Sequence, residues 1–365
     1  MKKRNLLIIL SLIVFILIGI FSQKAKEKAE KEKEIKNYES SVSKYENLKK
    51  LANEDGVIAA LAIDQRGSME KMMGKANPDL NNVEGISAYK KLVAEKLTPY
   101  ASSILLDPIY GLTGIKATDK NAGLILSYEQ TGYDEYDEER LPRLIELESG
   151  LKLKEKGANG IKVLLYYDVD DAEETNEKKK AWVERVGYEC EALGLPYFLE
   201  ILTYDAKMES EKTPEYAKIR PRKVIEATRE FSNPRYLVDV LKLETPIDMN
   251  YLEGFGKKEA LYNKEEALKY FKDQSNATDL PYIYLSGGIS ASLFQDMLRI
   301  AKEAGANFNG VLCGRATWRD SVDIYGKDQE KAANWLDITG KENITTLNEV
   351  LKETANSVFD KIEEA

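Results

Sequence analysis

The chain has 365 residues, of which 43% are hydrophobic and 9% aromatic, as is typical of a globular protein. Its formal net charge of −9 argues against nucleic acid as the main partner. It contains no histidine, which excludes zinc sites and Ser-His-Asp triads in their usual forms and leaves acid–base chemistry to Asp, Glu, Lys and Tyr. Cys190 and Cys313 are far apart, and we expect two buried, unreactive thiols rather than a disulfide framework.

Residues 1–37 differ from the rest of the chain. Residues 6–21 form a run of sixteen apolar or small residues without a charge, slightly short for a spanning helix and slightly long for the core of a signal peptide. We expect a single-pass membrane anchor with a charged juxtamembrane segment; the alternative is a cleaved signal and export. Three basic residues precede the run and six lysines follow it within fifteen residues, so the positive-inside rule keeps the following chain in the cytoplasm.

From residue 57 onward, short β-rich runs alternate with longer helical patterns. Near-continuous apolar strands separated by helices are typical of a parallel sheet that is covered on both faces. Eight such units predict a closed (β/α)8 TIM barrel over residues 38–365. The alternative, an open doubly wound sheet, lacks a glycine-rich phosphate fingerprint after its first strand. The expected strands are 57–63, 102–107, 123–128, 160–167, 196–202, 238–244, 281–286 and 308–314, with helices at 43–53, 84–97, 141–156, 177–193, 257–272, 290–304 and 342–363.

One lysine, Lys242, lies in the otherwise apolar strand 238–244. A strand alternates faces with a period of two residues, so Val240 and Lys242 share one face. A lysine that points into a packed interior is poorly solvated, which favours the neutral, nucleophilic amine that Schiff-base chemistry needs. The alternative is a lysine at a strand end whose ammonium reaches out to water.

Polar residues stand at or near the carboxyl ends of all eight expected strands, where a barrel carries its chemistry. Lys162 lies deeper, near the start of its strand. The period of two predicts that Lys162, Glu200 and Lys242 converge from neighbouring strands, where Glu200 can move protons between carbinolamine and enamine. The alternative is a buried Glu–Lys pair with a structural role only. The strand-end residues are Asp64, Gln65, Asp107, Glu129, Asp168, Glu200, Lys242, Ser286 and Arg315.

The last two strands are followed by Ser286-Gly287-Gly288 and by Gly314-Arg315. In barrels the loops after strands seven and eight often bind phosphate through backbone N–H groups. Glycine lets the backbone approach an anion closely, and arginine binds phosphate through two parallel hydrogen bonds. These two loops therefore predict a phosphate site.

Six segments carry a family resemblance, namely LAIDQRG (61–67), IKVLLYYDVD (161–170), LEILTYD (199–205), VDVLKLETP (238–246), DLPYIYLSGGIS (279–290) and FNGVLCGRATW (308–318). In these segments the chain resembles the class I tagatose-1,6-bisphosphate aldolases, from about residue 43 to its C-terminus. The resemblance implies that Lys242 forms the Schiff base, that Glu200 is the acid/base beside it, and that Asp64 handles the C4 hydroxyl proton. It implies substrate or phosphate contacts by Gln65, Lys162, Ser286, Gly287, Leu312 and Arg315, with no metal and no other cofactor.

The resemblance predicts cleavage of D-tagatose 1,6-bisphosphate to dihydroxyacetone phosphate and glyceraldehyde 3-phosphate. Fructose 1,6-bisphosphate, which differs only in the configuration at C4, and other phosphorylated or sulfonated ketoses stay open as substrates. A membrane-tethered sensor or scaffold that binds sugar phosphates is the alternative from another class. Two features depart from the family pattern, the anchor in residues 1–37 and the second glycine of SGGIS. The sequence does not indicate an oligomeric state.

Overall fold

A closed barrel of eight parallel strands forms the centre of the computed structural model, which describes residues 26, 28, 36, 39–132 and 139–362. The strands follow one another in sequence order, and β1 closes the barrel by pairing with β8. The prediction of a (β/α)8 barrel is confirmed, and the open doubly wound sheet is excluded. The strands are β1 (Ile58–Ala62), β2 (Ser103–Leu106), β3 (Gly123–Ser127), β4 (Gly160–Tyr167), β5 (Tyr197–Thr203), β6 (Val240–Leu243), β7 (Tyr282–Leu285) and β8 (Gly310–Cys313).

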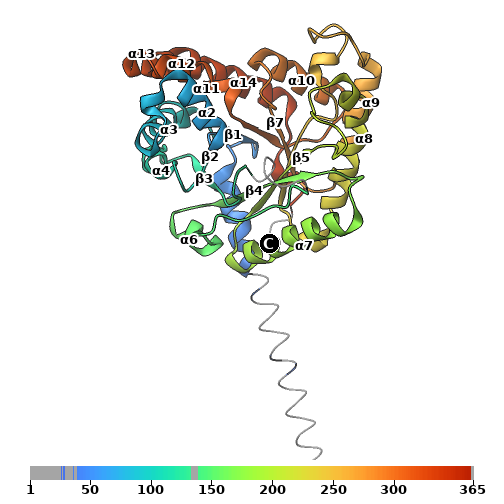
Figure 1. The fold of residues 1–365 in the computed structure, drawn as a ribbon. Coiled ribbons are helices and arrows are strands. Elements are labelled where there is room, and N and C mark those ends of the chain that lie inside the picture. The colour runs from blue at the N-terminus through green and yellow to red at the C-terminus, as the bar shows by residue number, and fades with distance from the viewer. Residues whose placement is uncertain (1–25, 27, 29–35, 37–38, 133–138, 363–365) are drawn as a thin grey trace, which may run out of the picture.

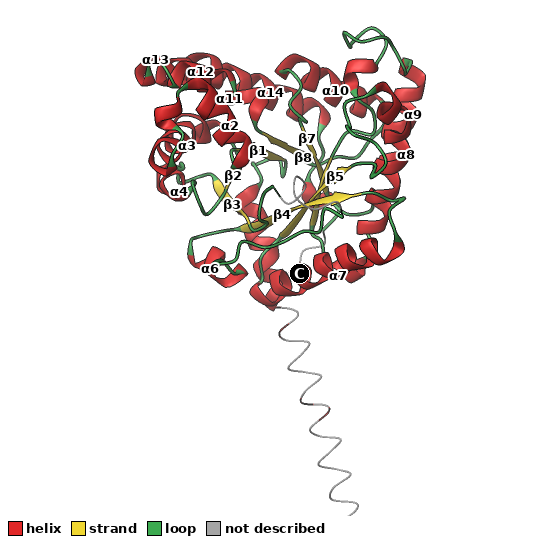
Figure 2. Cartoon of the chain, viewed as in Figure 1, coloured by secondary structure: helices red, strands yellow, loops and turns green. Residues whose placement is uncertain are grey.

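Helices surround the strands on the outside of the barrel (Figure 2). Most of them bury one apolar face against the strands, in one continuous core that includes Tyr89 of α3 and Phe231 of α8. The helices are α2 (Gly67–Ala76), α3 (Val83–Leu97), α4 (Leu112–Ala117), α6 (Gly150–Glu155), α7 (Glu173–Leu193), α8 (Pro214–Phe231), α9 (Lys264–Ser275), α10 (Ala291–Glu303), α11 (Arg315–Trp318), α12 (Asp320–Tyr325), α13 (Gln329–Trp335) and α14 (Lys341–Thr354).

Two expected helices begin later than predicted. The helix expected at 141–156 is confined to α6, because Leu144 bridges to Glu129 in extended conformation and Ser149 caps the helix at Lys152 N–H. The helix expected at 257–272 begins only at Lys264. Asn263 forms a capping box with Glu266, which fixes the start of α9 at that point.

Other helix boundaries also differ from the expectation. The last helix, expected to reach residue 363, ends at Thr354 and is followed by a 3₁₀ turn, Val358–Asp360. Helix α8 carries Pro221 in its interior, which removes a backbone donor and obscures the helical pattern in the sequence.

The two cysteines are buried and free, as predicted. Cys190 lies on the buried face of α7, and Cys313 lies at the end of β8. Burial raises the pKa of the Cys313 thiol to about 11 and that of Cys190 further. Both thiols therefore stay protonated and unreactive at neutral pH.

A helix of residues 39–51 closes the amino-terminal end of the barrel, and we call it the floor helix. It lies below the strands in Figure 1, where it is drawn in blue. Its Leu48 and Leu51 are fully or almost fully buried and join the apolar cluster inside the barrel. The other members of this cluster are Ile58, Ala60, Ala62, Leu105, Ile125, Phe198, Val240, Ile283, Leu312 and Val358.

Polar contacts and one glycine fix the floor helix against the strands. Lys44 Nζ lies 3.0 Å from Asp239 Oδ2, just before β6, and 2.7 Å from Glu191 Oε2 of α7. A Cβ on Gly123 would lie 2.3 Å from the carbonyl oxygen of Lys50, so only glycine permits this close approach. The amino-terminal end of the barrel is therefore filled, and space for a ligand remains at the other end.

The expected membrane anchor, residues 6–21, lies outside the described residues, as does most of the charged segment that follows it. Within the described part of the chain, none of the helices combines the length and the apolar character that crossing a membrane requires.

The floor helix predicts a measurable contribution to stability. Leu51 is fully buried, so Leu51→Ala leaves a cavity inside the barrel and should lower the free energy of unfolding by about 2–4 kcal/mol. Chemical denaturation followed by circular dichroism measures the change. Lys50→Ala, one residue away on the exposed side of the same helix, is the control and should stay within about 0.5 kcal/mol of wild type. Equal stability of the two variants would contradict a stabilising role for this helix.

Candidate active site

Four ionisable side chains meet inside the barrel, and the period of the strands predicts three of them, Lys162, Glu200 and Lys242. Glu200 on β5 lies between two lysines, with Oε1 2.9 Å from Lys242 Nζ and Oε2 2.6 Å from Lys162 Nζ. Glu200 is also the direct neighbour of Lys242 in the β5–β6 register. Asp64 follows β1 and accepts a hydrogen bond from Lys162 Nζ at 3.0 Å. All four residues are buried, with at most 8% of their surface exposed.

Two further buried residues, Glu129 and Arg66, extend this cluster. Glu129 follows β3, and its Oε1 lies 3.2 Å from Lys162 Nζ. Arg66, two residues beyond Asp64, donates through Nη2 to Glu129 Oε1 at 2.9 Å and through Nη1 to the Glu129 carbonyl at 2.7 Å. The sequence offers a signal for Glu129, which stands at a strand end; it offers none for Arg66, whose partner is 63 residues away.

The cluster alternates positive and negative groups, and this alternation sets their protonation. Burial by itself raises the pKa of a carboxyl group, but the Lys162 and Lys242 ammonium groups hold the pKa of Asp64 far below its usual range and lower that of Glu200. Burial by itself would lower the pKa of Lys162, yet Asp64, Glu129 and Glu200 together hold it well above its usual range. At neutral pH both carboxylates are ionised and Lys162 is a cation.

Two other strand-end carboxylates do not join the cluster. Asp107, which follows β2, pairs with Lys90 of α3, and the same ammonium donates to the Gln65 carbonyl at 2.8 Å. The contact supports the turn that carries Asp64 and Gln65, but Asp107 itself binds a helix.

Asp168 lies in a separate group of three carboxylates, which have a spacing that could hold a metal ion. The Lys223 ammonium of α8 forms ion pairs with all three carboxylates. It contacts Asp168, and its Nζ lies 2.9 Å from Asp205 Oδ2 and 3.2 Å from Asp170 Oδ2. A lysine therefore supplies the positive charge at this position, and the group links the loops after β4 and β5 to α8.

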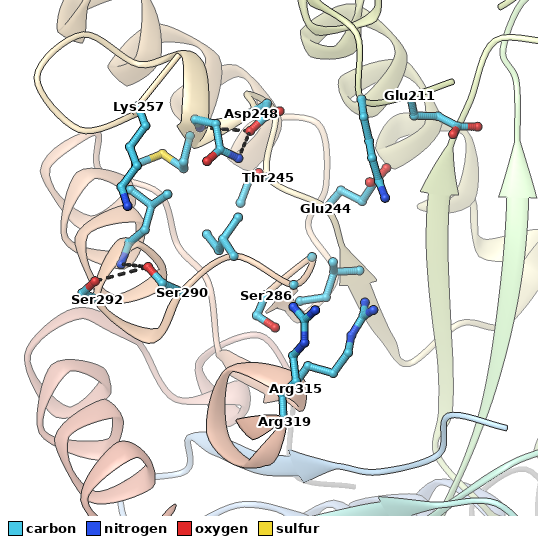
Figure 3. A pocket seen from close by; sticks show the side chains of 18 of the residues that line it. Glu211, Glu244, Thr245, Asp248, Lys257, Ser286, Ser290, Ser292, Arg315 and Arg319 are labelled. Atoms are coloured by element: carbon cyan, nitrogen blue, oxygen red, sulfur yellow. Dashed lines mark hydrogen bonds between the residues drawn. The ribbon is translucent and has the colours of Figure 1, made fainter. Parts of the chain in front are cut away.

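A cavity of about 1060 Å³ lies over the carboxyl ends of β6, β7 and β8. Figure 3 shows Ser286, Arg315 and Arg319 close together on one wall of this cavity. Gly287 and Gly288 have φ angles of +56° and +82°, which favour glycine, and a Cβ on Gly288 would lie 3.5 Å from the Arg315 guanidinium. The two loops that were expected to bind phosphate therefore face the same space.

Positive side chains predominate in the lining of this cavity, although the whole chain is acidic. Two of its acidic groups already have cationic partners: Glu244 lies 3.1 Å from Arg220, and Glu211 lies 2.9 Å from Arg140. The remaining positive charge suits an anionic ligand. The basic lining residues are Lys71, Lys212, Arg220, Lys257, Lys258, Arg315 and Arg319.

The remaining two expected site residues lie deeper. Leu312 is buried in β8, where its side chain belongs to the apolar cluster inside the barrel, so only its backbone is suited to a polar ligand. Gln65 is half-buried beside Asp64. Its Oε1 is one of three buried acceptor atoms near the cluster without a hydrogen-bond partner among the described residues; the others are Ser127 Oγ and Glu129 Oε2.

The chain matches known proteins over most of its length. A sequence model described as DeoC/LacD family aldolase matches residues 58–320. The proteins named tagatose 1,6-diphosphate aldolase from Staphylococcus aureus strains JH9 and Newman are each 55% identical to this chain over 318 residues, which cover 87% of this chain and 98% of each relative.

Solved structures of aldolases share the fold. Fructose-bisphosphate aldolase from Plasmodium falciparum, solved with TRAP and a small-molecule inhibitor, has a TM-score of 0.61 at 15% identity, covering 90% of this chain and 97% of that one. A Schiff-base-forming fructose-1,6-bisphosphate aldolase has a TM-score of 0.52 at 16% identity, covering 84% and 98%. At these identities the likeness concerns the fold alone. The match to the family model and the identity to the two relatives establish that the chain belongs to the DeoC/LacD aldolase family and is a lyase.

Proposed function

We propose that this chain is a class I, Schiff-base aldolase that cleaves D-tagatose 1,6-bisphosphate to dihydroxyacetone phosphate and glyceraldehyde 3-phosphate. The observation that carries the proposal is the buried contact of Lys242 with Glu200, which in turn contacts Lys162. It provides an amine, a carboxylate that can move protons, and a fixed cation in one place. The name of the relatives at 55% identity supports the choice of substrate.

Lys242 is the proposed nucleophile. Its amine attacks the C2 ketone, and loss of water from the carbinolamine leaves a protonated iminium. Glu200 Oε1, 2.9 Å from Lys242 Nζ, is placed to take the proton from the amine and to return it to the departing hydroxyl. The hydrogen bond from Lys162 to the other oxygen of Glu200 keeps the carboxylate oriented.

The iminium then serves as the electron sink for cleavage of the C3–C4 bond. Asp64 takes the proton of the C4 hydroxyl, the bond breaks, and glyceraldehyde 3-phosphate leaves while an enamine stays on Lys242. Asp64 then releases its proton to water, and Glu200 takes up a proton from water and delivers it to C3 of the enamine. Hydrolysis of the new iminium releases dihydroxyacetone phosphate and restores the free amine of Lys242. Lys162, a cation beside both carboxylates, stabilises their ionised forms and contacts the substrate hydroxyls.

The substrate's phosphate and hydroxyl groups match the rest of the site. Ser286, Gly287 and Arg315 line the cavity in which positive groups predominate, and they are proposed to bind one phosphate together with the backbone at Leu312, which lies deeper in β8. The buried acceptor atoms of Gln65 and Ser127 have hydrogen-bond capacity left over, which sugar hydroxyls would satisfy.

We also propose that the enzyme is tethered to the cytoplasmic side of a membrane by residues 6–21, with residues 38–365 as one barrel domain. The uncharged apolar run and the excess of lysines after it support this arrangement. The floor helix follows this segment in the chain and closes the end of the barrel opposite to the cavity. The mouth of the active site would therefore face away from the point of attachment.

The first test of the activity is a coupled assay of dihydroxyacetone phosphate released from D-tagatose 1,6-bisphosphate by the full chain. Lys242→Met removes the nucleophile and should lower kcat by at least about 1000-fold, since loss of a nucleophile removes the covalent route. Lys264→Met, an exposed lysine paired with Glu303 on the outside of the barrel, is the matched control and should match wild type. Retained turnover in Lys242→Met would exclude the proposed mechanism.

The protonation of the cluster predicts how stability depends on pH. The folded-state pKa values of Asp64 and Glu200 lie below their ordinary values. Their stabilisation is therefore complete above the unfolded-state values near pH 4 and is lost as the pH falls through the folded-state values. Lys162→Met leaves these carboxylates buried without their main cationic partner and should lower the free energy of unfolding by about 3–5 kcal/mol at pH 7.

The difference in the free energy of unfolding between wild type and Lys162→Met should narrow as the pH falls from 5 toward 3. A protonated carboxyl group is neutral and no longer requires an ammonium group to stabilise it in the interior. Urea denaturation at several pH values measures this difference. Lys264→Met again serves as the control, with a small difference that does not depend on pH. A gap of constant size between wild type and Lys162→Met would contradict the ionised state of Asp64 and Glu200 at neutral pH.

The tether predicts that the full chain sediments with membranes and resists extraction by high salt. A variant that lacks residues 1–37 should stay in the supernatant and keep its aldolase activity. High salt removes proteins held by charge alone, whereas an inserted apolar helix requires detergent. Release of the full chain by salt, or a mature N-terminus beyond residue 21 in mass spectrometry, would refute the anchor.

A further inference from the structure

The two lysines of the cluster differ in how many carboxylates they contact. Among the described residues, Lys162 Nζ lies within 3.2 Å of Asp64, Glu129 and Glu200, whereas Lys242 Nζ makes an ion pair with Glu200 alone, at 2.9 Å. A proton is harder to remove from an ammonium that contacts three carboxylates than from one that contacts one. The two amines are therefore prepared for different tasks.

Of the three carboxylates that contact Lys162, Glu129 is the one without a proposed role in the reaction. Asp64 and Glu200 have proposed proton-transfer roles, so their charge changes during the reaction. Glu129 is 1% exposed, its Oε1 contacts Arg66 as well as Lys162, and no step of the proposed reaction uses it. Glu129 can therefore keep its contact with Lys162 while the other two carboxylates gain and lose protons.

Arg66 donates two hydrogen bonds to Glu129, one from Nη2 to the side-chain Oε1 at 2.9 Å and one from Nη1 to the backbone carbonyl oxygen at 2.7 Å. The backbone on either side is also fixed: Tyr128 N–H donates to the Lys162 carbonyl at 2.9 Å, and Gln130 N–H donates to the Arg143 carbonyl at 2.8 Å. A buried ion pair contributes little net stability. These bonds fix the position of Glu129 Oε1 beside Lys162, while Oε2 has no partner among the described residues. Such an arrangement suits a group whose position matters to its neighbour.

We propose that Glu129, held by Arg66, is a positioning residue that keeps Lys162 as the permanent cation of the site and thereby leaves Lys242 as the nucleophile. This inference rests on the proposed aldolase function. The groups that face Lys162 are Asp64 after β1, Glu129 after β3, Glu200 on β5 and, beyond these, Arg66 and Lys242.

The test is the dependence of kcat and KM on pH for Glu129→Gln in the full chain, with D-tagatose 1,6-bisphosphate as substrate. The variant removes the charge and keeps the shape. We expect kcat to fall by about 10-fold with KM changed by less than about 3-fold, because the variant leaves the phosphate-binding loops unchanged and alters the charge beside the carboxylates that transfer protons. We also expect the alkaline limb of the kcat profile to begin at least about one pH unit lower than in wild type, since Lys162 gives up its proton more easily.

The matched control is Asp239→Asn, which removes a carboxylate from a lysine pair at the other end of the barrel, where Asp239 contacts Lys44. It should lower stability and leave the pH profile of kcat as in wild type. A merely structural role for Glu129 predicts the same outcome for Glu129→Gln. An unshifted profile in Glu129→Gln would therefore overturn the inference while the aldolase assignment stands, whereas a wild-type chain without aldolase activity would overturn both.

Arg66→Lys decides the question if Glu129→Gln does not fold. Lysine keeps the positive charge but cannot contact the carbonyl and the side chain of Glu129 together. We expect a several-fold lower kcat at unchanged KM, with the alkaline limb shifted in the same direction by a smaller amount. Wild-type kcat and an unshifted limb in this variant would overturn the inference.

Discussion

The structure depends on a balance of buried charge inside the barrel. Three cations and three carboxylates alternate from Arg66 through Glu129, Lys162 and Glu200 to Lys242, with Asp64 at the side of Lys162. Any one of these charges alone would be costly to bury, and each is stabilised by its neighbours. The same balance keeps the carboxylates ionised at neutral pH, so the arrangement that makes burial tolerable also prepares the groups for proton transfer.

The closed barrel makes this balance possible. Closure brings β1, β3, β4, β5 and β6 around one interior, so residues far apart in the sequence meet there. The floor helix and the apolar cluster below the charged groups seal one end, which confines the ligand to the other end. There the loops after β7 and β8 turn Ser286 and Arg315 toward a cavity in which positive groups predominate.

The interior of the site was predictable as far as the strands extend. Lys162, Glu200 and Lys242 lie within β4, β5 and β6, where the period of two fixes which face each side chain takes. Beyond a strand end the period no longer applies. Four carboxylates lie one or two residues past a strand and take different directions. Asp64 and Glu129 point into the cluster, whereas Asp107 and Asp168 point outward and contact lysines of α3 and α8. Those partners come from distant parts of the chain, and no local pattern reveals them.

The most direct test of the central claim is reduction of the covalent intermediate. The full chain is incubated with dihydroxyacetone phosphate, treated with borohydride, digested, and analysed by peptide mass spectrometry. We predict a single adduct on the peptide that contains Lys242, absent from the Lys242→Ala variant. An adduct on Lys162 would contradict the division of roles between the two lysines, and no adduct in a protein that still binds sugar phosphates would contradict the Schiff-base mechanism itself.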